Sequence, residues 1–314
     1  MVGREVTLFV GLGRMGEPMV RRYASVRPTL LFDVDAVTTA RLAEELGGEA
    51  LDDLITVPDN VDTVILMLPN SRIVENVLCG EKGGEGLLAR LPPGVLVIDM
   101  GSSEPASTRR LSELAARREL RFVDAPVSGG VAKAITGELS IMVGGEPGSA
   151  QLAQPHLALM GTSIVEVGPP GSGHAAKALN NLLSATNLAA AAEVLCIAQR
   201  AEIRPEVMVE VLNSSTGRSQ ATEVKYPKHV LTGTFASGFE MDLMLKDLAI
   251  AATLAQEGGL TTPITSRTVE TLDEARRWFD TSGLDHTEIV RYYEAANSAL
   301  LRTSADQPTE RPGE

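Results

Sequence analysis

Lys177 and Asn181 are the residues whose types and spacing point most directly to chemistry. The run from about His174 to Arg200 has no proline or glycine and predicts one helix of roughly 40 Å. Positions four apart share a helix face, so a proton donor and an amide would reach the same small molecule. Helical lysines are mostly solvated surface residues, but Lys177 stands in the apolar run AAKAL, behind a glycine-rich loop at 168–173. Lys177 is therefore a candidate acid–base residue, and His174 its neighbour one turn earlier.

A second constellation, near the N-terminus, has the pattern of a dinucleotide-binding loop. It directly follows the apolar run Val6–Val10 and reads Gly11, Leu12, Gly13, Arg14, Met15, Gly16. In this G-x-G-x-x-G pattern the first glycine permits a tight turn, the second admits a pyrophosphate, and the third lets helix and strand pack closely. The helix that follows would offer free N–H groups to the phosphates. Glycine turns also occur for steric reasons alone, but Asp33, twenty residues after Gly13, supplies the expected partner for the ribose hydroxyls.

The residues around Asp33 favour NAD over NADP. Asp35 follows closely and no arginine stands beside the pair to neutralise a 2′-phosphate. If these two carboxylates were poorly solvated, their repulsion of a 2′-phosphate dianion would cost several kcal/mol of NADP binding free energy. Asp35 itself suits a solvated helix cap.

Two further stretches place polar groups where a ligand could meet them. Val127, Ser128, Gly129 and Gly130 follow an apolar strand and could bring a hydroxyl and backbone N–H groups to a carboxylate. The same residue types also fit an ordinary strand-end turn. Lys246-Asp247 lies in a largely apolar helix, where a lysine requires a carboxylate or a ligand.

The elements that would position these residues form two patterns. From Val6 to about Val167, short apolar runs alternate with longer amphipathic ones, which predicts βαβ units and a mainly parallel sheet. After the turn cluster at 168–173 the pattern is helical. We therefore expect an α/β chain: a Rossmann-type doubly wound parallel sheet over 1–167, an all-α C-terminal domain over 168–302 that begins with a long interdomain helix, and a disordered tail over 303–314.

The bulk properties of the 314 residues exclude several classes of protein. A formal net charge of −13 with no basic cluster argues against nucleic acid and anionic membranes as partners. No uninterrupted apolar stretch approaches the ~20 residues of a membrane span, and no signal peptide is apparent, so we expect a cytoplasmic protein. Cys79 and Cys196 are far apart and have no metal-ligand spacing, so neither a disulfide nor a metal site is expected.

Four motifs in order give the chain a close resemblance to the 3-hydroxyisobutyrate dehydrogenase branch of the β-hydroxyacid dehydrogenases. They are GLGRMGEPM at 11–19, DAPVSGGVAKAITGELSIMVGG at 124–145, GPPGSGHAAKALNN at 168–181 and GFEMDLMLKDL at 238–248. The resemblance covers nearly the whole chain. It implies a nicotinamide-dependent dehydrogenase that acts on a small 3-hydroxy acid.

The resemblance also implies a role for each candidate residue. Lys177 would take the hydroxyl proton as hydride leaves the adjacent carbon. For the substrate, the resemblance implies that its acid group is held by Ser128, Gly129 and Gly130 and that Asn181 orients it. Lys246 would contact substrate or cofactor, with Asp247 as its structural partner. The nicotinamide would be lined by Leu68, Pro69 and Ser102. The chain departs from the family pattern at Ser102, where threonine is usual, and at Ile73, where asparagine is common.

Several alternatives remain open at this level. The substrate could be a tartronate semialdehyde or another sugar acid, and a non-catalytic dinucleotide-binding protein or an imine reductase could share the fold. The non-catalytic protein is disfavoured by the joint retention of Lys177, Asn181, Ser128 and Lys246, and the imine reductase by Lys177. Arg218, in the polar loop 213–219, either holds a second acidic group of the substrate or is an exposed loop residue. The apolar stripes of the helical region predict a homodimer or homotetramer.

Overall fold

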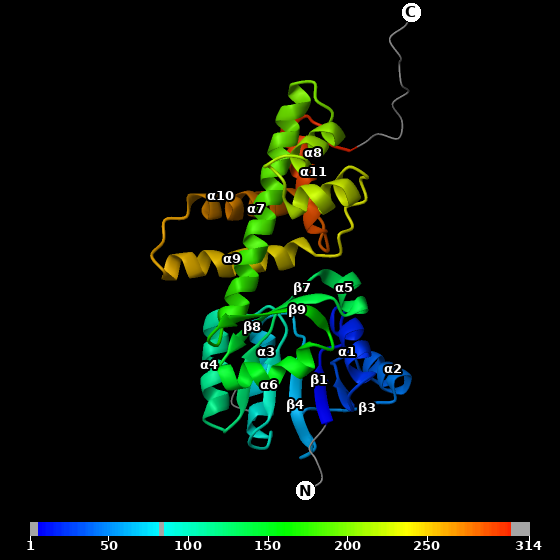
Figure 1. The fold of residues 1–314 in the computed structure, drawn as a ribbon, viewed down its shortest axis with the longest axis vertical. Helices are drawn as coiled ribbons and strands as arrows, with labels where there is room; N and C mark the ends of the chain where they lie inside the picture. The colour runs from blue at the N-terminus through cyan, green and yellow to red at the C-terminus, as the bar shows by residue number, and fades with distance from the viewer. Residues whose placement is uncertain (1–5, 82–84, 303–314) are drawn as a thin grey trace, which may run out of the picture. The chain divides into compact units, whose positions relative to one another are not determined.

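The structure is a computed structural model that describes residues 6–81 and 85–302 (Figure 1). The chain divides into two compact units, Met1–Ala178 and Leu179–Glu314, here called the first and second units. This division falls inside a long helix, beyond the change of sequence pattern at Gly168. The tail expected to be disordered lies outside the described residues.

The first unit is built on one sheet, whose described strands confirm the predicted Rossmann-type architecture. They are β1 (Val6–Val10), β2 (Thr29–Phe32), β3 (Glu49–Ala50), β4 (Val61–Leu66), β5 (Leu96–Asp99), β6 (Arg121–Asp124), β7 (Val127–Ser128), β8 (Leu139–Gly145) and β9 (Gly161–Gly168). The strand order is β3-β2-β1-β4-β5-β6-β8-β7, with β9 also paired to β8. Pairing is parallel from β3 through β6, whereas β8 runs antiparallel to β6 and β7.

Helices connect these strands and cover the sheet. They are α1 (Gly16–Ala24), α2 (Ala36–Leu46), α3 (Ser71–Cys79), the short η1 (Leu87–Ala89), α4 (Pro105–Ala116), α5 (Gly130–Thr136) and α6 (Pro147–Leu157). Successive residues of β1 enter two different apolar clusters, because side chains alternate along a strand. Phe9 joins the cluster that includes Met19 of α1, and Leu8 joins the one that includes Leu111 of α4. Burial on both faces explains why the central strands read as continuous apolar runs.

A polar link lies inside the core of the first unit. The Tyr23 hydroxyl contacts Nδ1 of His156 at 2.5 Å and Oγ1 of Thr7 at 2.7 Å, and all three side chains are buried. Burial lowers the pKa of His156 to about 4 and raises the pKa of Tyr23 to about 12. Both rings are therefore neutral at physiological pH, and they join α1 to α6 by hydrogen bonding.

Helices make up the second unit as the structure describes it. α7 (Ser172–Arg200) begins in the first unit and continues into the second; it is followed by α8 (Pro205–Asn213), the π-helix η2 (Ala221–Val230), α9 (Met241–Glu257), α10 (Pro263–Trp278), the short η3 (His286–Glu288) and α11 (Ile289–Asn297). Leu188 and Leu195 of α7 pack with Tyr226 and Leu248 in one apolar core. The all-α character expected from the sequence is confirmed.

α7 is long and apolar enough, by length and composition alone, to cross a membrane. Half of its most apolar window is buried inside the protein, as in the core helix of a globular unit. The other side of α7 exposes a stripe of apolar residues, here called the α7 stripe: Leu179 (50% exposed), Leu183 (61%), Val194 (37%) and Ile197 (68%). A helix that is apolar on both sides has more apolar surface than the described contacts cover.

Candidate functional site

The glycine loop has the geometry that its sequence predicts. A Cβ on Gly11, whose φ is +98°, would lie 2.3 Å from the carbonyl oxygen of Met67, and one on Gly16 would lie 1.9 Å from that of Gly11. Gly11 and Gly16 are therefore required by close packing of strand and helix. A Cβ on Gly13 would meet no protein atom within 4 Å. The backbone at Gly13 is open for a pyrophosphate to approach, so the loop fits a dinucleotide.

Asp33 lies against this loop at the end of β2. The backbone N–H of Leu12 donates to Oδ2 of Asp33 at 2.6 Å, and that of Asp35 donates to Oδ1 at 2.9 Å. These bonds hold an acidic side chain beside the glycine turn. Asp35 caps α2 by accepting from the N–H groups of Val37 and Thr38, and hydrogen bonding to Thr38 lowers its pKa. The cap predicted for Asp35 is therefore present.

The predicted nicotinamide-side residues follow neighbouring parallel strands. Leu68 and Pro69 come after β4, and Ser102 after β5. A Cβ on Gly101 would lie 2.4 Å from the carbonyl oxygen of Leu68, so the two loops touch through their backbones. Because β1, β4 and β5 are adjacent in the sheet, these loops and the glycine loop share one edge of it. The backbone N–H of Ile73 donates to Oδ1 of Asn70, the N-cap of α3, at 3.1 Å, and the apolar Ile73 side chain has no group to hydrogen-bond a cofactor.

The Ser128 loop has a backbone that few residues other than glycine adopt. Ser128 ends β7, where it pairs with Ser140 of β8. Gly129 and Gly130 follow with φ values of +131° and +69°. The strand-end turn left open by the sequence is therefore present, and it places two residues without side chains directly after the Ser128 hydroxyl.

A buried carboxylate fixes the start of α7. Asp124, at the end of β6, accepts from the backbone N–H of Gly171 at 2.8 Å and from that of His174 at 2.9 Å. His174 is itself buried, with Nδ1 2.8 Å from Oγ1 of Thr108. These contacts hold the His174 imidazole in the interior at the start of α7. Lys177 follows one turn later, so its backbone position depends on Asp124.

Sequence reasoning did not single out Asp124. Its signal was an acidic residue at a strand end, directly before the PVSGG turn. Gly144 and Gly173 surround it so closely that a Cβ on either would lie within 2.8 Å of a carboxylate oxygen of Asp124. These contacts join Asp124 to residues 20 and 49 positions later in the chain, so they become visible only in the folded structure.

In the second unit, Asn181 and Lys246 meet through one carboxylate. Nδ2 of Asn181 donates to Oδ2 of Asp247 at 2.6 Å, and Nζ of Lys246 lies 3.1 Å from Oδ1 of the same residue. Asn181 and Asp247 are buried. Asp247 is thus the local carboxylate expected for Lys246, and it also orients the Asn181 amide. Arg218 is largely exposed, with Nε 3.5 Å from a carboxylate oxygen of Glu223.

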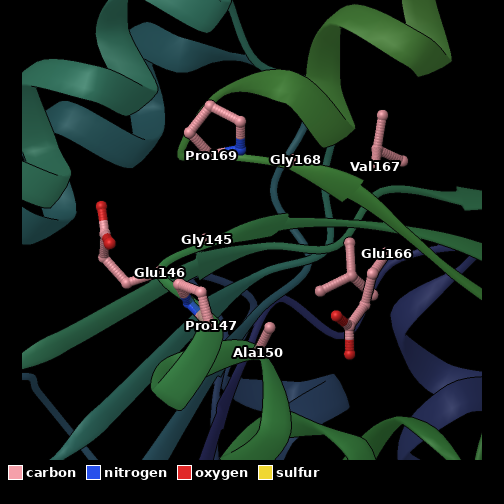
Figure 2. Close-up of a pocket in the computed structure, with 9 residues that line it drawn as sticks. Gly145, Glu146, Pro147, Ala150, Glu166, Val167, Gly168 and Pro169 are labelled. Carbon is pink, nitrogen blue, oxygen red and sulfur yellow. The ribbon is translucent and has the colours of Figure 1, made fainter.

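A cavity of about 430 Å³ lies among β8, β9 and the start of α6 (Figure 2). Its lining residues are Val143, Gly145, Glu146, Pro147, Ala150, Glu166, Val167, Gly168 and Pro169. Both charged residues in this lining are carboxylates, and Figure 2 shows them on opposite sides of the pocket. It therefore suits an acidic substrate poorly. None of the predicted site residues lines it.

Comparisons with known proteins agree with this geometry. Residues 7–168 match the family model for the NAD binding domain of 6-phosphogluconate dehydrogenase, and residues 171–293 match that for the NAD-binding region of NADP-dependent 3-hydroxyisobutyrate dehydrogenase. The chain is 37% identical to 2-(hydroxymethyl)glutarate dehydrogenase of Eubacterium barkeri over 85% of this chain and 88% of that protein. It is 33% identical to a Pseudomonas aeruginosa 3-hydroxyisobutyrate dehydrogenase, over 91% and 97%.

A solved structure supports the same relationship. The Mycobacterium tuberculosis 3-hydroxyisobutyrate dehydrogenase with L-serine superimposes with a TM-score of 0.83 at 28% identity. The match covers 92% of this chain and 98% of that one. The order of both units is therefore shared over nearly the whole length.

The different surroundings of Gly13 and Gly16 give a paired test. Gly13→Ala is expected to leave the unfolding temperature near wild type, since its Cβ meets no protein atom, but to weaken NADH binding more than about tenfold by obstructing the pyrophosphate. Gly16→Ala forces a steric conflict and is expected to cost about 1–3 kcal/mol of stability or more. NADH fluorescence titration and thermal unfolding of both variants measure the two effects. Wild-type NADH affinity in Gly13→Ala would refute the assignment of Gly13.

Proposed function

We propose a function from the family of this chain, which belongs to the 3-hydroxyisobutyrate dehydrogenase branch of the β-hydroxyacid dehydrogenases. The proposed reaction is the transfer of a hydride between NAD and the hydroxyl-bearing carbon of a small 3-hydroxy acid. The observation that carries the proposal is the anchoring of α7. Asp124 fixes the first turn of the helix that bears Lys177 to the same sheet whose glycine loop leaves Gly13 open.

The proposed chemistry divides between cofactor and chain. The glycine loop and Asp33 would hold the dinucleotide, with Leu68, Pro69 and Ser102 toward its nicotinamide, which accepts or donates the hydride when bound. Lys177, in its neutral form, would accept the proton of the substrate hydroxyl during oxidation and return it to the oxygen during reduction. Asn181, oriented by Asp247, would donate its amide N–H to the substrate, and the Ser128 hydroxyl would donate to the acid group.

The proposed substrates share a common core. 3-Hydroxyisobutyrate, L-serine and 2-(hydroxymethyl)glutarate, named in the relatives, all carry a CH2OH group on the carbon next to a carboxylate. A lysine for the hydroxyl and a Ser-Gly-Gly turn for the acid suit that core. Tartronate semialdehyde or another sugar acid is the second candidate substrate. A purely dinucleotide-binding role is disfavoured, because Ser128, Lys177, Asn181 and Lys246 are all retained.

We also propose a homodimer or homotetramer. The support is the α7 stripe, since a symmetric copy would cover apolar surface that the described residues leave exposed. Light scattering at micromolar concentration is expected to give twice or four times the chain mass of 33.3 kDa. A mass of one chain would contradict it.

The cytoplasmic location expected from the sequence remains a prediction, which cell fractionation would test.

The position of Asp33 predicts a preference for NAD. Its carboxylate is held beside the glycine loop, where the 2′-phosphate of NADP would bring a second negative charge. We expect kcat/KM on the best substrate to be at least about tenfold higher with NAD. Initial-rate kinetics with both cofactors measure the ratio. A higher value with NADP would show that Asp33 does not select the cofactor.

Lys177→Ala tests the acid–base assignment. We expect kcat to fall by about 10²–10⁴-fold, with NADH affinity unchanged because the glycine loop and Asp33 are not altered. Steady-state rates and NADH fluorescence titration separate the two effects. Lys228→Ala, an exposed lysine of η2, is the matched control and should behave as wild type. If Lys177→Ala kept more than about a tenth of wild-type kcat, Lys177 could not be the acid–base residue.

A further inference from the structure

Two acidic side chains lie next to each other in the interior of the first unit. Asp99 ends β5 and Asp124 ends β6, and the two residues are register partners in these adjacent parallel strands. Both residues are fully buried. Partners in register on neighbouring strands direct their side chains to the same face of the sheet, where two carboxylates repel each other. Such a pair needs polar neighbours that hold each carboxylate in place.

The imidazole of His174 lies between the two carboxylates. Its Nε2 is 3.7 Å from Oδ2 of Asp99, and its Nδ1 is 3.8 Å from Oδ2 of Asp124. Nδ1 also lies 2.8 Å from Oγ1 of Thr108 on α4. The His174 side chain is itself fully buried. Both ring nitrogens therefore face protein oxygens, and the ring connects the ends of two strands to α4 and α7.

The first carboxylate shapes the turn that carries Ser102. Oδ1 of Asp99 accepts from the backbone N–H of Gly101 at 3.0 Å, and Oδ2 accepts from the hydroxyl of Ser103 at 2.8 Å. These two donors flank Ser102, which the proposed function assigns to the nicotinamide. A displacement of the Asp99 carboxylate would therefore be transmitted to this turn.

The second carboxylate shapes the helix start that leads to Lys177. Asp124 accepts from the backbone N–H groups of Gly171 and His174, and Lys177 follows in the next turn of α7. All of these residues belong to the first unit. His174 thus lies against the two carboxylates that place the Ser102 turn and the Lys177 helix.

We propose that His174 is a positioning residue that ties the Ser102 turn to the helix bearing Lys177, so that the nicotinamide and the acid–base group are aligned together. This rests on the proposed function, which supplies the roles of Ser102 and Lys177. Alignment matters for the rate, because reacting atoms must approach within about 3–3.5 Å and a misplacement of about 1 Å can cost about 100-fold. His174 acts through these two neighbours and does not itself contact the substrate.

The ring nitrogens distinguish a link from a side chain that only fills space. Nε2 of His174 has no hydrogen-bond partner among the described residues, although it is buried and Oδ2 of Asp99 is 3.7 Å away. A shift of about 0.5–1 Å brings this pair to hydrogen-bond distance. The contact can therefore tighten as the Ser102 turn settles around a dinucleotide. An apolar side chain of similar volume offers no such contact.

Kinetics test the assignment. Wild type, His174→Leu, His174→Gln and the control His229→Leu, in η2 of the second unit, are assayed with NAD and 3-hydroxyisobutyrate or L-serine. Single-turnover formation of NADH measures hydride transfer. We expect His174→Leu to lose about 100-fold in this rate and in kcat, with KM and NADH affinity within about threefold of wild type. His174→Gln keeps an amide N–H that can reach Asp99 and should recover to within about tenfold of wild type, and His229→Leu should match it.

A residue with only a structural role would lower the unfolding temperature and leave the kcat of the folded enzyme unchanged. That result, or equal losses in His174→Leu and His174→Gln, would overturn the proposal. Should His174→Leu fail to fold, Thr108→Val removes the hydroxyl that contacts Nδ1 and is expected to give the same pattern with a loss of about tenfold.

Hydrogen exchange separates this proposal from the proposed function. We expect backbone amides at 101–103 and 171–177 to exchange at least about tenfold faster in His174→Leu and at near wild-type rates in His174→Gln, with β1 and β2 unchanged. If both segments loosen while wild type oxidises no hydroxy acid, the link stands and the proposed function fails. If hydroxy acids are oxidised but only one segment or neither loosens, the proposed function stands and the link fails. If neither effect is seen, both fail.

Discussion

The hold of the Asp124 carboxylate on the first turn of α7 is the interaction on which the rest of the candidate site depends. The Asp124 side chain is fully buried. Its two carboxylate oxygens accept hydrogen bonds from two backbone N–H groups that the start of a helix would otherwise leave unsatisfied. A negative charge at this end also complements the helix dipole. Removing one partner of a buried charged hydrogen bond is far costlier than removing an exposed one. The first helical turn, and Lys177 after it, is therefore fixed to the end of β6 with little freedom.

The same edge of the sheet is arranged by backbone contacts that exclude side chains. Gly11 approaches Met67, and Gly101 approaches Leu68, so that the loops after β1, β4 and β5 touch without intervening Cβ atoms. Of the three glycines in the motif, only Gly13 has open space where a Cβ would lie. Parallel strands make this possible, because their carboxyl ends collect at one edge.

The sequence predicted the parts that depend on local pattern. Continuous apolar runs indicated the buried strands, glycine spacing indicated the loop at Gly11–Gly16, and the absence of proline and glycine indicated α7. It could not predict that β8 runs antiparallel to β6, because its run LSIMVGG carries no signal of direction. Nor could it identify the contacts of Asp124 with His174, or of Lys225 with Ser184, which join residues 50 and 41 positions apart. The roles of individual site residues follow from the family resemblance, whereas the structure supplies their local geometry.

The neutral imidazoles of His156 and His286 make each unit sensitive to acid. A free histidine takes up a proton near its ordinary pKa of about 6.5, whereas both of these rings resist protonation until the pH has fallen to about 4. Between those values the unfolded chain binds more protons than the folded one, so stability is greatest above about 6.5 and declines as the pH falls through the interval. The two cores thus share a proton linkage: acidification through this interval lowers the stability of each, because unfolding takes up a proton at each ring.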